Sequence, residues 1–256
     1  MRHESFARLA LLCAALLLSA PRAHAAVGMA LRWDRCAGDA GVVNKNFACD
    51  VNTGSETLVG SFMLSRPSPS TSGLEIVLTL ASASPTMPAW WAFRNAGTCR
   101  TSALTMGFNA PTGSVNCVDW DPTNSMAGGI GAYQFPSAVG PNTSRIVAVV
   151  AVPQSALADL VTDQEYFAFR FGINHTKTVG TGACGGCEVP VCLLLQKIDV
   201  ITPTSHQALS TWWMSPDDLY ATWQGGAGVS TSLGSGCPAA TPTRNATWGA
   251  IKTLYR

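Results

Sequence analysis

The chain has 256 residues, a formal net charge of +1 and a charged-residue content of only 12%. A near-neutral chain argues against a nucleic-acid partner and against an anionic membrane surface, because both call for a basic face. The 24 glycines and 15 prolines supply turns between short strands. The composition therefore indicates a turn-rich all-β protein.

The first 25 residues have the pattern of a cleaved secretory signal. Arg2 and Arg8 form a basic start, residues 9–18 form an apolar run, and Ala23–Ala25 supplies an A-x-A cleavage site. The run is shorter than the roughly 20 apolar residues of a membrane span, and no later segment is long enough. We expect cleavage after Ala25, a secreted chain in the periplasm or outside the cell, and one domain over residues 26–256. Removing the signal takes away three basic residues and one acidic residue. The predicted mature chain then has 13 basic and 14 acidic residues and a net charge of about −1.

The first half of the mature chain contains three strand patterns and two loops bracketed by cysteines. Residues 29–34, 57–64 and 74–80 alternate or are rich in β-branched and apolar residues, which is typical of strands. Cys36 and Cys49 flank a loop rich in glycine, asparagine and aspartate, so we expect a local disulfide there. Cys99 and Cys117 enclose a second loop, for which we expect the same.

The second half begins with a glycine-rich stretch at 128–133 that we interpret as irregular. The run 145–152 is almost continuously apolar and predicts a strand buried on both faces. Residues 154–160 predict one or two helical turns. In the strand pattern at 165–173, alternation places four apolar side chains on one face: Phe167, Phe169, Phe171 and Ile173.

Two further features complete the fold prediction. Residues 193–201 form the last long strand pattern, with a shorter one at 220–223, and apolar residues at helical spacing in 247–256 predict a short C-terminal helix. Many short strands with little helix predict an all-β, disulfide-stapled β-sandwich of the jelly-roll or immunoglobulin-like type.

Four cysteines lie close together or late in the chain: Cys184, Cys187, Cys192 and Cys237. With the four already named they make an even number in a chain predicted to be exported, which favours four disulfides. Three connectivities among these last four stay open. The alternative is a zinc site, because C-x-x-C is a ligand spacing, but no second C-x-x-C exists and export favours oxidation. We therefore expect no cofactor and no metal at these cysteines.

Catalytic patterns are weak. His175 and His206 are the only histidines of the predicted mature chain, and we interpret both as residues of loops or strand ends. Asp119 and Asp121 are two apart and would face one side of a strand, which leaves a glycoside hydrolase as the third functional hypothesis. The same two carboxylates with Asn124 are a weak candidate for calcium.

Tryptophan is abundant, and exposed tryptophans can stack on sugars. Because adjacent tryptophans on a strand point to opposite faces, one of each pair could be exposed, while ordinary core packing is the alternative. The candidates for ligand stacking are Trp90, Trp91, Trp120, Trp212 and Trp213.

Two motifs resemble a group of uncharacterised exported bacterial proteins. The first is the NKNFACD segment at 44–50 with LVGSF at 58–62, and the second is the ending TWGAIKTLYR at 247–256. The resemblance implies a secreted, disulfide-bonded chain and implies no activity and no catalytic residue.

The leading hypothesis is a secreted, non-enzymatic β-sandwich with a structural or binding role at or outside the cell surface. Its partner would be an extracellular protein or a glycan, with no nucleic acid and no membrane span. The alternative is a carbohydrate-binding module that uses exposed tryptophans.

Overall fold

The computed structural model describes residues 27–121, 123–210, 218–231 and 236–239. The predicted signal (1–25), the Trp212–Trp213 pair and the predicted C-terminal helix (247–256) lie outside these residues. The described part of the chain has no helix that is both long enough and apolar enough to cross a membrane.

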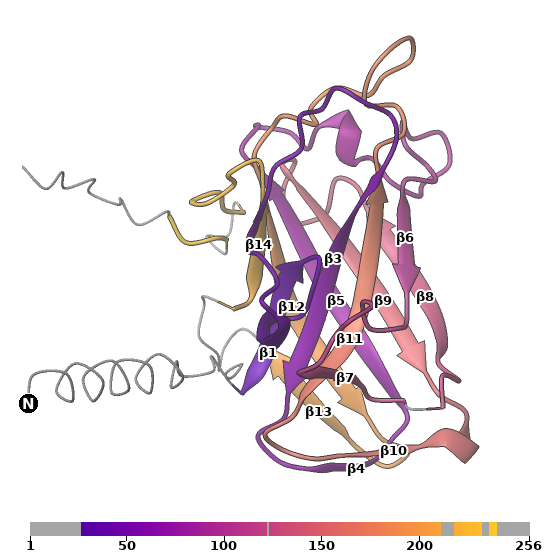
Figure 1. Ribbon diagram of the computed structural model, residues 1–256. Coiled ribbons are helices and arrows are strands. Elements are labelled where there is room, and N and C mark those ends of the chain that lie inside the picture. Colours follow the sequence, from indigo (N-terminus) through magenta and orange to yellow (C-terminus); the bar gives the residue numbers. More distant parts are fainter. Residues whose placement is uncertain (1–26, 122, 211–217, 232–235, 240–256) are drawn as a thin grey trace, which may run out of the picture.

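Two large sheets dominate the fold (Figure 1). Sheet 1 has the order β1 (Gly28–Trp33), β3 (Ser55–Met63), β11 (Glu165–Asn174) and β6 (Leu104–Gly107), and the short β7 (Cys117–Asp119) also pairs with β11. Sheet 2 has the order β2 (Asn44–Lys45), β14 (Tyr220–Trp223), β12 (Val191–Ile201), β5 (Gly73–Ser82), β9 (Thr143–Ala151) and β8 (Ala127–Gln134), with β13 (His206–Ser210) also beside β12.

Smaller elements connect the sheets. A two-stranded ribbon pairs β4 (Ser68–Thr71) with β10 (Ala158–Leu160). The short 3-10 helices are η1 (Ala37–Asp39), η2 (Ala89–Trp91) and η3 (Gln154–Ala156). The predicted helical turns at 154–160 are therefore one 3-10 turn followed by the strand β10.

A shared hydrophobic core lies between the two sheets. Alternate residues of β5 (Leu74, Ile76, Leu78 and Leu80) are buried in it, and Phe169, Phe171 and Ile173 of β11 pack into the same cluster. This is the period-2 pattern that the sequence shows, with one face of each sheet buried. The prediction of an all-β, disulfide-linked sandwich is confirmed.

The strand registers define two ends of the sandwich. At the first, which we call the Cys-rich end, Ser55 pairs with Asn174 and Val191 pairs with Ser82. At the second, the β4–β10 end, Met63 pairs with Glu165 and β12 reaches Ile201. In Figure 1 the Cys-rich end is at the top, with η2 and the long loop after β11, and β4 and β10 are at the bottom.

Two predictions about sheet 2 are wrong. The strand β9 is not buried on both faces: Val149 is 47% exposed and Ala151 is exposed, whereas Ala148 and Val150 are buried. The stretch at 128–133 is not irregular but belongs to the edge strand β8, which pairs with β9. The outward face of β9 is exposed at Val149 and Ala151, so the unbroken apolar run does not mean burial on both faces.

A bulge corrects the prediction for β11. Phe167 pairs with Ser61 and Phe169 with Gly60, so one extra residue separates them on β11. The bulge places Phe167 on the outer face of sheet 1, in a small second cluster with Val59 and the Cys36–Cys117 disulfide. Phe167 and Phe169 therefore do not share a face.

Candidate functional site

All eight cysteines of the described residues form disulfides, but both local bridges predicted from the sequence are wrong. The bonds are Cys36–Cys117, Cys49–Cys187, Cys99–Cys184 and Cys192–Cys237. They span 81, 138, 85 and 45 residues, respectively. The two bracketed loops are therefore joined to distant segments of the chain. The zinc alternative is also wrong, because Cys184 and Cys187 bond outside their predicted group of four.

The Cys184–Cys187 turn connects three segments at the Cys-rich end. One of its cysteines holds the loop before β3 and the other holds the loop before β6. The main-chain N–H of Trp90 donates to the carbonyl of Gly185 at 2.9 Å. Gly186 has φ +98°, and a Cβ there would lie 2.2 Å from Pro88 Cβ, so the close approach of the η2 loop requires glycine.

Three buried tryptophans pack together beneath this turn. Trp90 and Trp223 have ring centroids 5.1 Å apart in a stacked arrangement, and Trp91 meets Trp223 edge-on at 5.7 Å. Trp223 Nε1 donates to the carbonyl of Cys187 at 2.7 Å. Aromatic packing of this kind stabilises a core beyond its buried area.

The prediction of exposed, sugar-stacking tryptophans is wrong for every candidate that the structure describes. Trp90 and Trp91 are fully buried, and Trp120 is 1% exposed. The pair at 90–91 lies on a 3-10 helix and not on a strand, so the alternation that would expose one of them does not apply.

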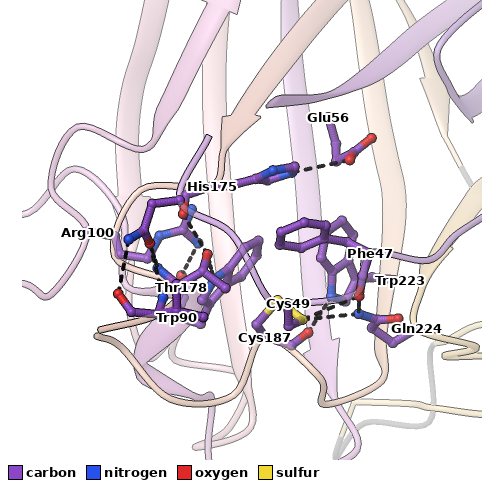
Figure 2. The surroundings of a disulfide bond; sticks show 12 residues. Phe47, Cys49, Glu56, Trp90, Arg100, His175, Thr178, Cys187, Trp223 and Gln224 are labelled. Carbon is purple, nitrogen blue, oxygen red and sulfur yellow. Dashed lines mark hydrogen bonds and ion pairs between the residues drawn. A yellow bond between two sulfur atoms is a disulfide. The ribbon is translucent and has the colours of Figure 1, made fainter. Parts of the chain in front are cut away.

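Arg100 clamps the η2 loop to the end of β11. Its guanidinium donates from Nη1 to the carbonyl of Trp90 (2.8 Å), from Nε to that of Thr176 (2.9 Å), and from Nη2 to that of Asn174. It also lies 3.7 Å from the centre of the Trp90 ring, a cation–π contact (Figure 2). Burial lowers the pKa of Arg100 to about 9, which leaves the group cationic at neutral pH.

His175 is held by contacts on both ring nitrogens. Nδ1 lies 2.7 Å from the carbonyl of Thr53, which can only accept a hydrogen bond, so Nδ1 carries a proton. Nε2 lies 3.2 Å from Glu56 Oε1, and the imidazole stacks on Phe47 with centroids 3.7 Å apart (Figure 2). The interpretation of His175 as a residue of a strand end is consistent with its position directly after β11.

A chain of ion pairs extends from His175 toward the surface. The other oxygen of Glu56 lies 2.8 Å from Lys45 Nζ, which also binds both oxygens of Asp34 at 2.9 Å. Burial alone would lower the pKa of Lys45, but the hydrogen bonds to Glu56 and Asp34 raise it overall. This chain of ion pairs fixes the loop that contains Cys49 against β3, and every member of it has a partner.

Of the two carboxylates considered for catalysis and for calcium binding, Asp121 accepts hydrogen bonds from its own loop on both oxygens. Asp121 Oδ1 accepts from the N–H and hydroxyl of Thr123 at 2.9 and 2.5 Å, and Oδ2 accepts from the N–H and hydroxyl of Ser125 at 2.6 and 3.0 Å. Burial raises the pKa of Asp121, but these four hydrogen bonds lower it overall. A cation at Asp121 would have to displace donors that already satisfy both oxygens.

Asp119 and Asn124, the other two residues considered for calcium binding, form hydrogen bonds with separate partners. Asp119 Oδ1 accepts from the N–H of Ala110 at 3.0 Å, and burial raises the pKa of Asp119. The side-chain oxygen of Asn124 accepts from the amide of Asn109. The pKa values of Asp119 and Asp121 thus move in opposite directions, as an acid–base pair requires, but neither residue lines the cleft described below.

A buried carboxylate that sequence reasoning missed is Glu165. It accepts hydrogen bonds from the N–H groups of Ala37 and Gly38 (3.1 and 2.8 Å) and from Ser61 Oγ (2.5 Å), and burial raises its pKa. With the Cys36–Cys117 sulfurs it makes the one cluster of three possible metal ligands in the described ranges, but those sulfurs are bonded to each other. Nothing in the sequence distinguishes this glutamate, because its partners come from a loop more than 100 residues earlier.

An open cleft of about 610 Å³ lies at the β4–β10 end. Its walls are the segment Arg66–Ser70, Leu157 and the turn Thr202–Gln207 between β12 and β13. These segments follow the ends of β3, β9 and β12 (Figure 1). Of the residues that line the cleft, only His206 stands out in the sequence, as a residue of a loop or strand end, and no sequence pattern predicts the cleft itself.

No protein-family model matches this sequence, and searches of curated proteins and of solved structures find no significant match. The resemblance to exported bacterial proteins therefore stays a prediction.

Proposed function

We propose that this chain is an exported, non-enzymatic β-sandwich that serves as a structural or binding protein at or outside the cell surface. The observation that supports it most strongly is the disulfide framework. Four bonds, three of them at the Cys-rich end, join segments 45 to 138 residues apart. Disulfides of this kind form and persist in oxidising compartments, which agrees with the predicted signal at residues 1–25.

Two of the side chains considered for catalysis, His175 and Asp121, support a non-enzymatic role. His175 Nδ1 is taken by the Thr53 carbonyl, its Nε2 is buried 3.2 Å from Glu56 Oε1, and both oxygens of Asp121 accept hydrogen bonds from their own loop. A general base or a nucleophile needs an unshared atom directed at a substrate. These groups are used instead to hold loops in place.

The test compares the full chain with a version that lacks residues 1–25. We expect the full chain to be exported, to begin at Ala26 and to show no free thiol after denaturation. The shortened version should stay in the cytoplasm with reactive thiols. Export with free thiols, or retention of the full chain, would contradict the proposal.

The non-enzymatic part has its own test on the exported protein. We expect no turnover of generic glycoside, ester and peptide substrates. Turnover that disappears in the Asp119→Asn and Asp121→Asn variants, while the four disulfides stay intact, would replace the proposal with the hydrolase hypothesis.

Carbohydrate binding is the second candidate function. The exposed tryptophans that motivated it are not found among the described residues, so the tryptophans named there do not support it. What favours it is the cleft at the β4–β10 end, which is open and lined by prolines and hydroxyl groups.

A further inference from the structure

We propose that the cleft at the β4–β10 end binds an acidic saccharide, whose carboxylate is recognised by Arg66. This proposal rests on the binding role proposed above and names its site and its ligand class. The cleft volume of about 610 Å³ lies within the roughly 300–1,000 Å³ of typical ligand pockets. That space accommodates a short oligosaccharide.

Arg66 supplies the charge. Its side chain is exposed in the cleft, and the partner it has is Gln207, whose Oε1 accepts from Arg66 Nε at 3.4 Å. Within the described ranges, no carboxylate pairs with Arg66. Its two terminal nitrogens therefore keep their donors for a ligand, and a guanidinium fork matches the geometry of a carboxylate.

The neighbouring acids do not pair with Arg66. Asp199 is shared between His206 Nδ1 (3.1 Å) and Lys197 Nζ (3.3 Å), and Asp159 accepts from the main-chain N–H of Ser70 at 2.8 Å. Lys197 also pairs with Glu75 at 2.8 Å. Acidic side chains near the cleft thus have partners other than Arg66, and within the described residues none of them forms an ion pair with it.

The remaining lining suits a sugar ring. Pro67, Pro69 and Pro203 present apolar ring surfaces to the C–H face of a sugar. The hydroxyl groups of Ser70 and Thr204 have no hydrogen-bond partner in the described part of the chain, so they can donate to and accept from sugar hydroxyls. The cleft thus combines apolar ring surfaces with polar groups, which suits a sugar, because a sugar ring has both a C–H face and hydroxyl groups.

The same geometry disfavours a peptide. An extended peptide binds by pairing its main chain with an unpaired strand edge. Here the main chain of the turn bonds to itself, because Thr202 N–H donates to the Ser205 carbonyl (2.8 Å) and Ser205 N–H donates to Thr202 Oγ1 (3.0 Å). The N–H of Ser70 is likewise taken by Asp159. At the turn and at Ser70, it is therefore side chains and not main-chain N–H groups that are left to recognise a ligand.

The experiment is isothermal titration of the exported, disulfide-bonded protein with three carboxylated probes: tetragalacturonate, a mannuronate oligomer and sialyllactose. Neutral matches are the methyl ester of tetragalacturonate and lactose, and tetraglutamate is the peptide probe. We expect at least one acidic saccharide to bind, and its neutral match to bind about tenfold more weakly, the loss expected for one charged hydrogen-bonded contact.

Two arginine variants locate the site. Arg66→Ala should weaken binding of the acidic probe about tenfold and remove its advantage over the neutral match, and Arg66→Lys should recover part of it. Arg35→Ala removes the same charge from an exposed arginine that does not line the cleft, and it should have no effect. A thiol count on each variant shows that the framework is intact.

Three results would overturn the proposal: no carboxylated probe binds more tightly than about 1 mM, Arg66→Ala and Arg35→Ala behave alike, or tetraglutamate binds better than the saccharides. Because export and thiol content are measured without any probe, an exported, fully bridged protein that ignores all the saccharides removes only the cleft assignment. It leaves the proposed extracellular role standing.

Discussion

Removing the Cys49–Cys187 bond tests the disulfide network, because its effect depends on the other bonds. Judged by its 138-residue span alone, the bond should stabilise the fold by about 5 kcal/mol in the chain-entropy model. The remaining bonds shorten the loop that it closes. The shortest covalent path between the two cysteines crosses the Cys36–Cys117 and Cys99–Cys184 bonds; its stretches of 13, 18 and 3 residues come to about 34 residues. That loop corresponds to about 4 kcal/mol.

The matched control is the Cys192–Cys237 bond, which spans 45 residues. No other bond shortens its loop, so it also corresponds to about 4 kcal/mol. We expect the Cys49→Ala/Cys187→Ala and Cys192→Ala/Cys237→Ala variants to lose similar free energies of unfolding. Urea denaturation followed by tryptophan fluorescence measures both, because five tryptophans are fully or almost fully buried.

The reasoning fails if the first variant loses at least 1 kcal/mol more than the second, which is what independent loops predict. It also fails if removing Cys49–Cys187 costs less than about 1 kcal/mol, because the bond would then not constrain the unfolded chain. Peptide mapping of the unreduced protein checks the pairing itself: a Cys36–Cys49 peptide would contradict the structure before any stability is measured.

Two further changes test the packing and the buried carboxylate. Gly60→Ala should destabilise the protein by roughly 2 kcal/mol, because the added Cβ would lie 2.1 Å from the ring of Phe169. The control is Gly129→Ala, which should change the stability little, because no atom lies within 4 Å of its added Cβ. Chemical denaturation measures the free energy of unfolding of both variants. Glu165→Gln tests a pH dependence. Burial raises the folded-state pKa of Glu165 above 4.5, so ionisation opposes folding, and the wild type should lose stability relative to Glu165→Gln as the pH rises from about 4 to 7. A constant difference across that range would show that Glu165 has the same pKa folded and unfolded.

The long strands could be predicted because their information is local. The alternating or apolar runs at 57–64, 74–80 and 193–201 coincide with β3, β5 and β12 to within a few residues. Each of these strands contributes apolar residues to the core between the two sheets, and the hydrophobic pattern reports that burial directly. The prediction for 128–133 is wrong, because the glycines there, which usually indicate a turn, belong to the edge strand β8.

The errors share one physical cause, which is that they depend on contacts between distant segments. The bulge before Phe169 arises where β11 passes Gly60, and only the register with β3 reveals that Phe167 faces outward. Trp90 and Trp91 are buried because Trp223, more than 130 residues later, packs on both of them. Sequence spacing predicts a local bridge for Cys36 and Cys49, but the fold brings each of them close to a different partner.

The two ends of the sandwich differ in a way that bears on function. The Cys-rich end has three of the four disulfides, and Arg100 there donates hydrogen bonds to main-chain carbonyls of the η2 loop and of the end of β11. The β4–β10 end has the fourth disulfide, Cys36–Cys117, and leaves the terminal donors of Arg66 and the hydroxyl of Thr204 without a hydrogen-bond partner among the described residues. A ligand gains most from groups that have no internal partner, because binding then breaks no existing hydrogen bond. The proposed binding role therefore places the ligand at the β4–β10 end, where donors without an internal partner line the cleft.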